Sequence, residues 1–182
     1  MPTLTAAVVL LAVLTIANLF ILLGVVRKLR EAASAPAGRP VDLPGLPALG
    51  SEVTPFREDT LTDEAFTDEH LRDGVSLLVF MSPHCGPCTE TVRRLTEGRD
   101  ALPARVVVLL EGESGDPDLV AFAQPLDGIG TIATFSSLGP AARAFGVTAF
   151  PTAVLVDSGY VVDASFDYAD LLPNARESAP AR

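Results

Sequence analysis

The stretch from Val75 to Cys88 constrains the fold more than any other part of this sequence. Leu77 to Met81 form an apolar run with β-branched and aromatic members, a pattern typical of a strand buried on both faces. The tetrapeptide Cys-Gly-Pro-Cys follows at positions 85–88, and Pro87 suits the first turn of a helix, where its missing N–H costs nothing. The sequence therefore predicts a strand that delivers two thiols to a helix N-terminus, whose partial positive charge favours a thiolate.

Cysteine usage and charge narrow the range of functions. The chain has 2 cysteines and a formal net charge of −10. A disulfide between Cys85 and Cys88 would close a very small loop and would stabilise the fold little, so the pair points to chemistry and not to scaffolding. A surface this acidic would repel phosphates, which argues against nucleic acid as a partner.

The N-terminal segment predicts a membrane anchor. Residues 4–26 carry no charged side chain, and a helix of this length spans a hydrocarbon core of roughly 30 Å. A cleaved signal peptide is the alternative, but no Lys or Arg precedes the apolar run, which is also longer than the usual signal core of about 7–15 residues. Arg27, Lys28 and Arg30 flank its C-terminal side, and the positive-inside rule alone would place the following domain in the cytoplasm.

The remaining composition predicts the domain organisation. Residues 1–30 form the anchor with its basic flank, 31–52 an Ala/Pro/Gly-rich linker, 53–172 one folded domain and 173–182 a flexible tail. The order of elements predicts an α/β fold, with a mixed central sheet and helices on both faces. Strands are expected at 53–56, 77–81, 105–110, 129–135, 153–156 and 160–164, and helical segments at 62–72, 86–99, 116–123, 139–144 and 167–172.

Two separated motifs carry a family resemblance. Cys85-Gly86-Pro87-Cys88 follows one apolar strand, and the pattern from Gly146 to Pro151-Thr152 precedes another. In this order and spacing the chain resembles the thioredoxin superfamily from about residue 53 to 172. With an N-terminal anchor it is most similar to the membrane-tethered TlpA/ResA-type thiol-disulfide oxidoreductases. The approach from Met81 to Cys85 is also similar to MauD-like members, which assist methylamine dehydrogenase maturation.

The resemblance implies a role for each site residue. Cys85 would be the nucleophile and Cys88 the resolving thiol, held by the helix start at Gly86 and Pro87. Phe150–Pro151 would be a cis peptide bond that faces the cysteines and helps to bind substrate backbone, with an ordinary trans turn as the alternative. His84, if protonated, would favour the thiolate further, although it could equally be a plain exposed residue.

The resemblance also implies partners and a compartment. The chain would act as a reductase on a disulfide-containing protein, with an upstream thiol as electron donor and no cofactor beyond its own redox-active disulfide. The domain would lie outside the cytoplasm, where disulfides persist, although the basic flank indicates the opposite orientation. A non-catalytic module that binds a client during cofactor maturation or assembly is the alternative from another class. Metal binding is disfavoured because only His70 and His84 could add ligands to the cysteines.

The sequence departs from thioredoxin at three points. His84 stands where thioredoxin has Trp, and Val79 stands at the position of its buried acidic residue. Proton transfer from Cys88 therefore lacks an obvious relay. The final helix is also expected to be short or absent.

Overall fold

The computed structural model describes residue 15, residues 45–62 and residues 64–177. The chain divides into two compact units, Met1–Val41 and Asp42–Arg182, and every element described below belongs to the second. The predicted membrane anchor lies almost wholly outside the described residues. Within the described part of the chain, no helix combines the length and apolar character needed to span a bilayer.

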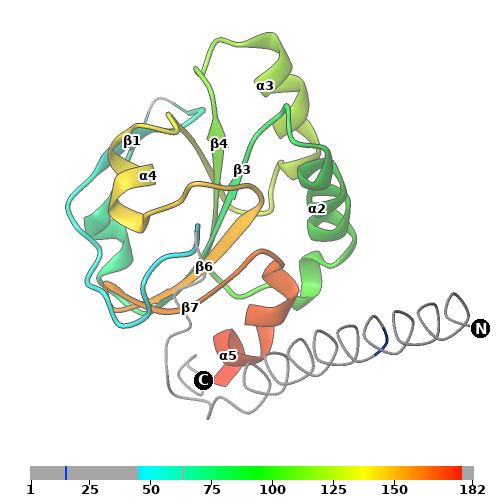
Figure 1. The fold of residues 1–182 in the computed structure, drawn as a ribbon. Helices are drawn as coiled ribbons and strands as arrows, with labels where there is room; N and C mark the ends of the chain where they lie inside the picture. Colours follow the sequence, from blue (N-terminus) through cyan, green and yellow to red (C-terminus); the bar gives the residue numbers. More distant parts are fainter. Residues whose placement is uncertain (1–14, 16–44, 63, 178–182) are drawn as a thin grey trace, which may run out of the picture. The chain divides into compact units, whose positions relative to one another are not determined.

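One mixed five-stranded sheet forms the centre of the domain, as the sequence predicts (Figure 1). The strand order is β5-β4-β3-β6-β7; β4 and β5 run parallel to β3, whereas β6 is antiparallel to β3 and β7 is antiparallel to β6. The strands are β3 (Val75–Met81), β4 (Val106–Glu111), β5 (Thr131–Phe135), β6 (Thr152–Asp157) and β7 (Tyr160–Ser165). The central strand β3 is almost entirely buried because neighbours cover both its edges and both its faces.

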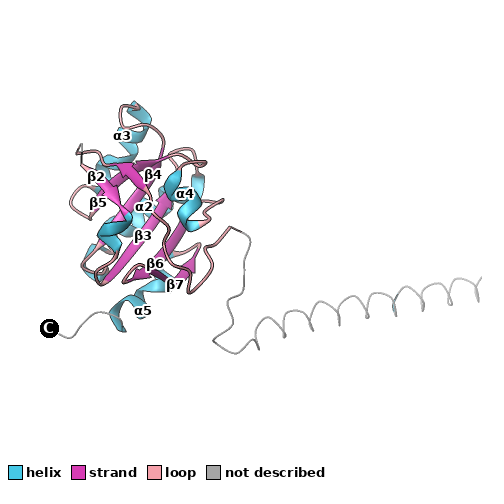
Figure 2. Cartoon of the chain, turned by 90° about the vertical axis from the view of Figure 1, so that its left-hand side faces the viewer, coloured by secondary structure: helices cyan, strands magenta, loops and turns pink. Residues whose placement is uncertain are grey.

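Helices cover both faces of this sheet (Figures 1 and 2). The α-helices are α2 (Gly86–Glu97), α3 (Pro117–Ala123), α4 (Pro140–Phe145) and α5 (Leu172–Glu177), and the 3-10 helices are η1 (Asp68–Leu71), η2 (Arg99–Ala101), η3 (Gln124–Leu126) and η4 (Tyr168–Leu171). Alternate side chains of β3 enter two separate cores. Phe80 packs in the core that holds Phe145 of α4, and Val79 packs in the core that holds Leu95 of α2. This alternation follows from the two-residue period of a strand.

The N-terminal part of the domain differs from the sequence prediction. The edge strand expected at 53–56 is wrong, because the strand lies at β1 (Arg57–Asp59) and pairs with β2 (Ala65–Thr67). The helical start expected at Thr62 is also wrong. The reason is the Thr60 hydroxyl, which donates to the Glu64 carbonyl at 2.8 Å and accepts from the Glu64 N–H at 3.1 Å. These bonds close a hairpin turn in place of a helix cap.

Other turns follow from the backbone preferences of single residues. Gly146 ends α4 in the left-handed conformation at φ 62°, the usual C-terminal stop signal. Ser158 and Gly159 both have positive φ in the turn between β6 and β7, as a two-residue hairpin of this type requires. Thr67 precedes η1 as its N-cap, and its N–H donates to His70 Nδ1 at 3.2 Å.

The end of the domain folds onto the α2 side of the sheet. The helical turn expected near residues 167–172 is present as η4 and continues into the short helix α5. Tyr168 and Ala175 are buried in the same core as Leu95 of α2. Arg94 of α2 donates to Asp167 Oδ2 at 2.8 Å and lies over the Tyr168 ring at 5.5 Å, which ties α2 to this final segment.

Candidate functional site

The corner between β3 and α2 carries the two thiols, as predicted from the sequence. β3 ends at the buried Met81, and Cys85 occupies the N-cap of α2 with extended backbone angles of φ −99° and ψ 112°. Pro87 lies in the first turn, where a helix can accept it. The Cys88 N–H donates to the Cys85 carbonyl at 3.0 Å. Backbone hydrogen bonds therefore place both sulfurs at the start of one helix.

Cys85 and Cys88 form a disulfide with a Cα–Cα distance of 5.2 Å. The two sulfurs differ sharply in exposure. Cys85 is half-buried and Cys88 is 0% exposed. Because only Cys85 is accessible from outside, only its Sγ can meet a sulfur of another protein without a change in the fold.

The electrostatics of the helix start favour an anion at Cys85. Unpaired N–H groups at a helix N-terminus act like roughly half a positive charge. The first turn of α2 holds no acidic side chain that would offset it. The first carboxylate along the helix, Glu90, is bound by Arg93, whose Nε donates to Glu90 Oε2 at 2.9 Å. This hydrogen bond lowers the pKa of Glu90, so the Glu90 carboxylate stays ionised and paired with Arg93.

Cys88 lies in an apolar environment. Its core includes Leu77, Val79, Met81 and Val92. Val79, at the position of the thioredoxin acid, is 1% exposed. An apolar environment raises the pKa of a thiol, so Cys88 is the less acidic of the two once the disulfide is reduced.

The loop before β6 faces Cys85. The Phe150–Pro151 peptide bond is cis, as predicted. The Phe150 carbonyl oxygen lies 3.5 Å from Cys85 Sγ, so a reduced Cys85 could donate its S–H to this oxygen. The Thr152 hydroxyl donates to the Ala149 carbonyl at 2.8 Å, and the Phe150 ring contacts that of Phe135 at a centroid distance of 5.7 Å. These contacts hold the loop from both sides.

The remaining predicted residues are placed as follows. Gly86 and Pro87 are exposed at the start of α2. His84 is also exposed, and its backbone N–H lies 3.4 Å from Ser82 Oγ. His70 is hydrogen-bonded to Thr67 at the start of η1. Within the described residues, no group of three or more His, Cys, Asp or Glu side chains is arranged to hold a metal ion.

Sequence reasoning missed one contact of this site. Gly45 lies beside Thr148 and Ala149, directly before Phe150. Its only signal in the sequence is a Gly between two prolines, which also fits an ordinary linker.

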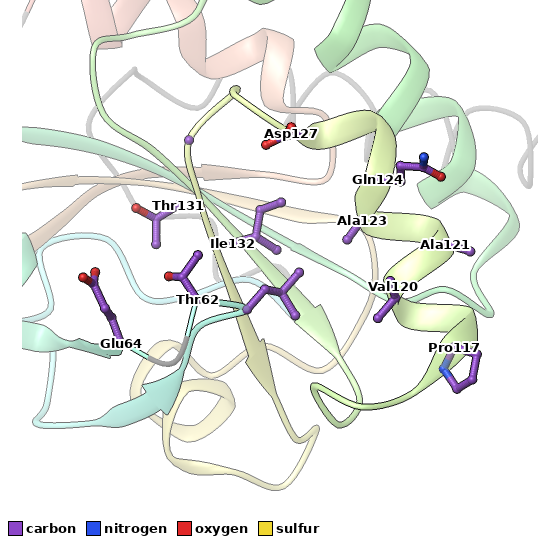
Figure 3. A pocket seen from close by; sticks show the side chains of 12 residues that line it. Thr62, Glu64, Pro117, Val120, Ala121, Ala123, Gln124, Asp127, Thr131 and Ile132 are labelled. Carbon is purple, nitrogen blue, oxygen red and sulfur yellow. The ribbon is translucent and has the colours of Figure 1, made fainter.

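A cavity of about 960 Å³ lies elsewhere in the domain (Figure 3). The side chains of Val120, Ile132 and Leu61 give it an apolar lining between α3, β5 and the β1–β2 turn. None of the predicted site residues lines it. The two cysteines therefore lie away from this cavity.

Comparison with solved structures agrees with this geometry. The thioredoxin domain of a thiol-disulfide oxidoreductase from Bacteroides vulgatus matches with a TM-score of 0.61 at 15% identity, covering 71% of this chain and 96% of that one. The chain has a thioredoxin-like fold. This thioredoxin-like domain is also similar to a secreted Mycobacterium tuberculosis disulfide oxidoreductase homologous to Escherichia coli DsbE, with a TM-score of 0.55 at 18% identity over 67% of this chain and 95% of that one.

A third similar structure is a DsbE-type thiol:disulfide interchange protein from Chlorobium tepidum, with a TM-score of 0.55 at 22% identity, covering 71% of this chain and 95% of that one. No protein-family model matches the sequence, and no curated protein matches it. The likeness is thus one of fold, and the function has to be argued from the site itself.

Proposed function

We propose that this protein is a thiol-disulfide oxidoreductase that acts on protein disulfides through Cys85 and Cys88. One observation carries the proposal: a half-exposed sulfur at a helix N-terminus is bonded to a fully buried one and faces the carbonyl of Phe150. An accessible sulfur with a lowered pKa can attack, and a sheltered neighbour can resolve the product. The similar solved structures described as disulfide oxidoreductases support this reading.

In the proposed reaction the Cys85 thiolate attacks one sulfur of a client disulfide. A Cys85–client disulfide forms, the client S–S bond breaks, and the released client thiolate takes up a proton. Cys88 then loses its proton and attacks Cys85 Sγ, which forms the internal disulfide and releases the second client thiol. Two electrons pass from the dithiol to the client, and an upstream dithiol protein returns them by the same exchange.

The neighbouring residues would support these steps. The backbone of Phe150 and Pro151 would pair with the client chain next to the sulfur under attack. His84, exposed beside Cys85, would stabilise the thiolate when protonated. Among the described residues the one buried carboxyl group is that of Asp68, which is bound by Arg72, so water would take the Cys88 proton. We assign the reducing direction because the Gly86-Pro87 dipeptide between the cysteines is the one found in thioredoxin.

The finer assignment is a membrane-tethered, TlpA/ResA-type protein with a MauD-like approach to its first cysteine. The uncharged run at residues 4–26 supports the tether. We place the domain outside the cytoplasm, where client disulfides persist. Cells treated with a reductant and then with a membrane-impermeant maleimide should label Cys85 without lysis. Labelling that requires lysis would place the domain in the cytoplasm.

Trapping of a mixed disulfide tests the exchange reaction. In a Cys88→Ser variant the first step proceeds and the second cannot, so a client adduct should accumulate on Cys85 and be visible by mass spectrometry. Cys85→Ser is the matched control and should trap nothing. Absence of an adduct in Cys88→Ser would refute the mechanism. Equal rates of insulin reduction by wild type and Cys85→Ser would instead favour a non-catalytic client-binding module.

A further inference from the structure

The segment that enters the domain packs against the loop of the active site. Gly45 has φ +96°, and a Cβ built on it would lie 3.1 Å from Thr148 Oγ1, 3.6 Å from Ala149 Cβ and 3.7 Å from Phe166 Cζ. Pro47, two residues later, is buried. The backbone conformation therefore strains any residue with a side chain at position 45, and a Cβ there would force Thr148 Oγ1 to move by a few tenths of an ångström.

The same segment is fastened to the sheet a few residues further on. The Gly50 N–H donates to the Val161 carbonyl at 2.7 Å, and the Val161 N–H donates to the Ser51 carbonyl at 2.9 Å. Val161 belongs to β7, the edge strand of the sheet. The segment is thus held by backbone hydrogen bonds at one end and by contact with Thr148 and Ala149 at the other.

Only Phe150 stands between Ala149, which lies beside Gly45, and the sulfur of Cys85. Ala149 precedes Phe150, whose carbonyl oxygen lies 3.5 Å from Cys85 Sγ. Ala149 is also held from the other side, by the Thr152 hydroxyl. A shift of the backbone at Thr148–Ala149 would therefore move the oxygen that faces Cys85.

We propose that Gly45 is a positioning residue for the thiol chemistry: by packing flat on Thr148 and Ala149 it holds the Phe150 carbonyl oxygen in place against Cys85. The inference rests on the proposed function of Cys85. It predicts a measurable property of the thiol, because a carbonyl oxygen that accepts the S–H stabilises the neutral form and opposes the pull of the helix N-terminus. Moving the Phe150 carbonyl oxygen away from Cys85 therefore lowers the pKa of Cys85.

The chain offers a closely matched control. Gly50 has a similar φ of +79°, but a Cβ there would meet nothing within 4 Å. Gly45→Ala and Gly50→Ala thus carry similar backbone strain, and only the first presses on the loop. Thr148→Ala removes the oxygen that the new Cβ would crowd, so the Gly45→Ala/Thr148→Ala pair should recover part of the original geometry.

The experiment measures the pKa of Cys85 from the pH dependence of its alkylation by iodoacetamide. All variants are made in the full chain with Cys88→Ser, so that Cys85 is the only thiol. His84 is present in every variant and drops out of the comparison. We expect Gly45→Ala to lower the pKa by roughly 0.3–0.7 units, Gly50→Ala to leave it unchanged, and Thr148→Ala to restore it in the pair.

Two results would overturn the inference: an unchanged or higher pKa in Gly45→Ala, or an equal shift in Gly50→Ala. Pro47→Ala loosens the same segment and serves as the second variant if Gly45→Ala does not fold, with the same shift expected and the same results overturning the inference. If only this inference fails, the Cys88→Ser variant with Gly45 unchanged still traps clients. Absence of trapping there marks the failure of the proposed function itself.

Discussion

The disulfide should stabilise the folded protein only modestly, and the sign of this effect reports the direction of the reaction. It closes a loop of four residues, because the sequence separation is 3. The chain-entropy relation for such a loop gives about −6.2 cal/mol/K, or about 1.9 kcal/mol at 298 K. Reduction removes this contribution but creates a Cys85 thiolate that the start of α2 stabilises by about 0.5–1 kcal/mol. The oxidised form should therefore be more stable than the reduced form by about 1–1.5 kcal/mol.

Guanidinium unfolding of both redox forms measures this difference. Far-UV circular dichroism is the suitable probe because the chain has no Trp. Since 30 mV corresponds to about 1.4 kcal/mol for two electrons, the folded disulfide should be roughly 20–30 mV harder to reduce than the unfolded one. A Cys85→Ser/Cys88→Ser variant should show no response to reductant. A reduced form more stable than the oxidised form would refute the reducing direction, because such a protein drives oxidation of its partners.

Three further substitutions test the surroundings of the site. Val79→Asp places a carboxyl group beside Cys88 and should cost about 3 kcal/mol or more at pH 7 by urea unfolding; a loss below about 1 kcal/mol would contradict the apolar description of that core. Asp167→Asn removes a carboxylate whose pKa is lowered mainly by its hydrogen bond from Arg94. The stability that ionised Asp167 contributes is present above its unfolded pKa and is lost as pH falls through its lower folded pKa. At pH 7 the variant should therefore be less stable than wild type by at most about 1 kcal/mol, because both partners are partly exposed. This difference should shrink, and not grow, as the pH is lowered from 7 to 3. Glu58→Gln replaces a carboxyl whose pKa is raised mainly by burial, while its oxygen can still accept from the Ala141 N–H at 2.8 Å. Ionisation of Glu58 costs stability as pH rises, so the variant should be at least as stable as wild type at pH 7 and less pH-dependent over roughly pH 4–7, and a less stable variant would refute this.

The parts of the fold that could be predicted from sequence are those set by local patterns. The apolar run before Cys85 predicts β3, and Pro87 and Gly146 mark helix ends through their own backbone preferences. The cis bond at Pro151 is implied by the resemblance of two motifs to the thioredoxin superfamily. For β3 and the helix ends, the residues that carry the signal are within a few positions of the structure they determine.

The parts that could not be predicted depend on contacts between distant residues. The hairpin of β1 and β2 is closed by the Thr60 hydroxyl, and Thr60 also forms a bridge with Ala133 of β5, more than 70 residues away in the sequence. The contact of Gly45 with Thr148 joins positions about a hundred residues apart. Neither pairing leaves a periodic trace in the sequence.

The pKa of Cys85 in the reduced wild-type protein tests the central claim most directly. The rate of its alkylation as a function of pH, with the modified sulfur identified by peptide mass spectrometry, gives that value. The account predicts a pKa below the roughly 8.5 of an ordinary cysteine, with Cys88 unreactive over the same range. A pKa at or above roughly 8.5, or equal reactivity of the two sulfurs, would contradict it.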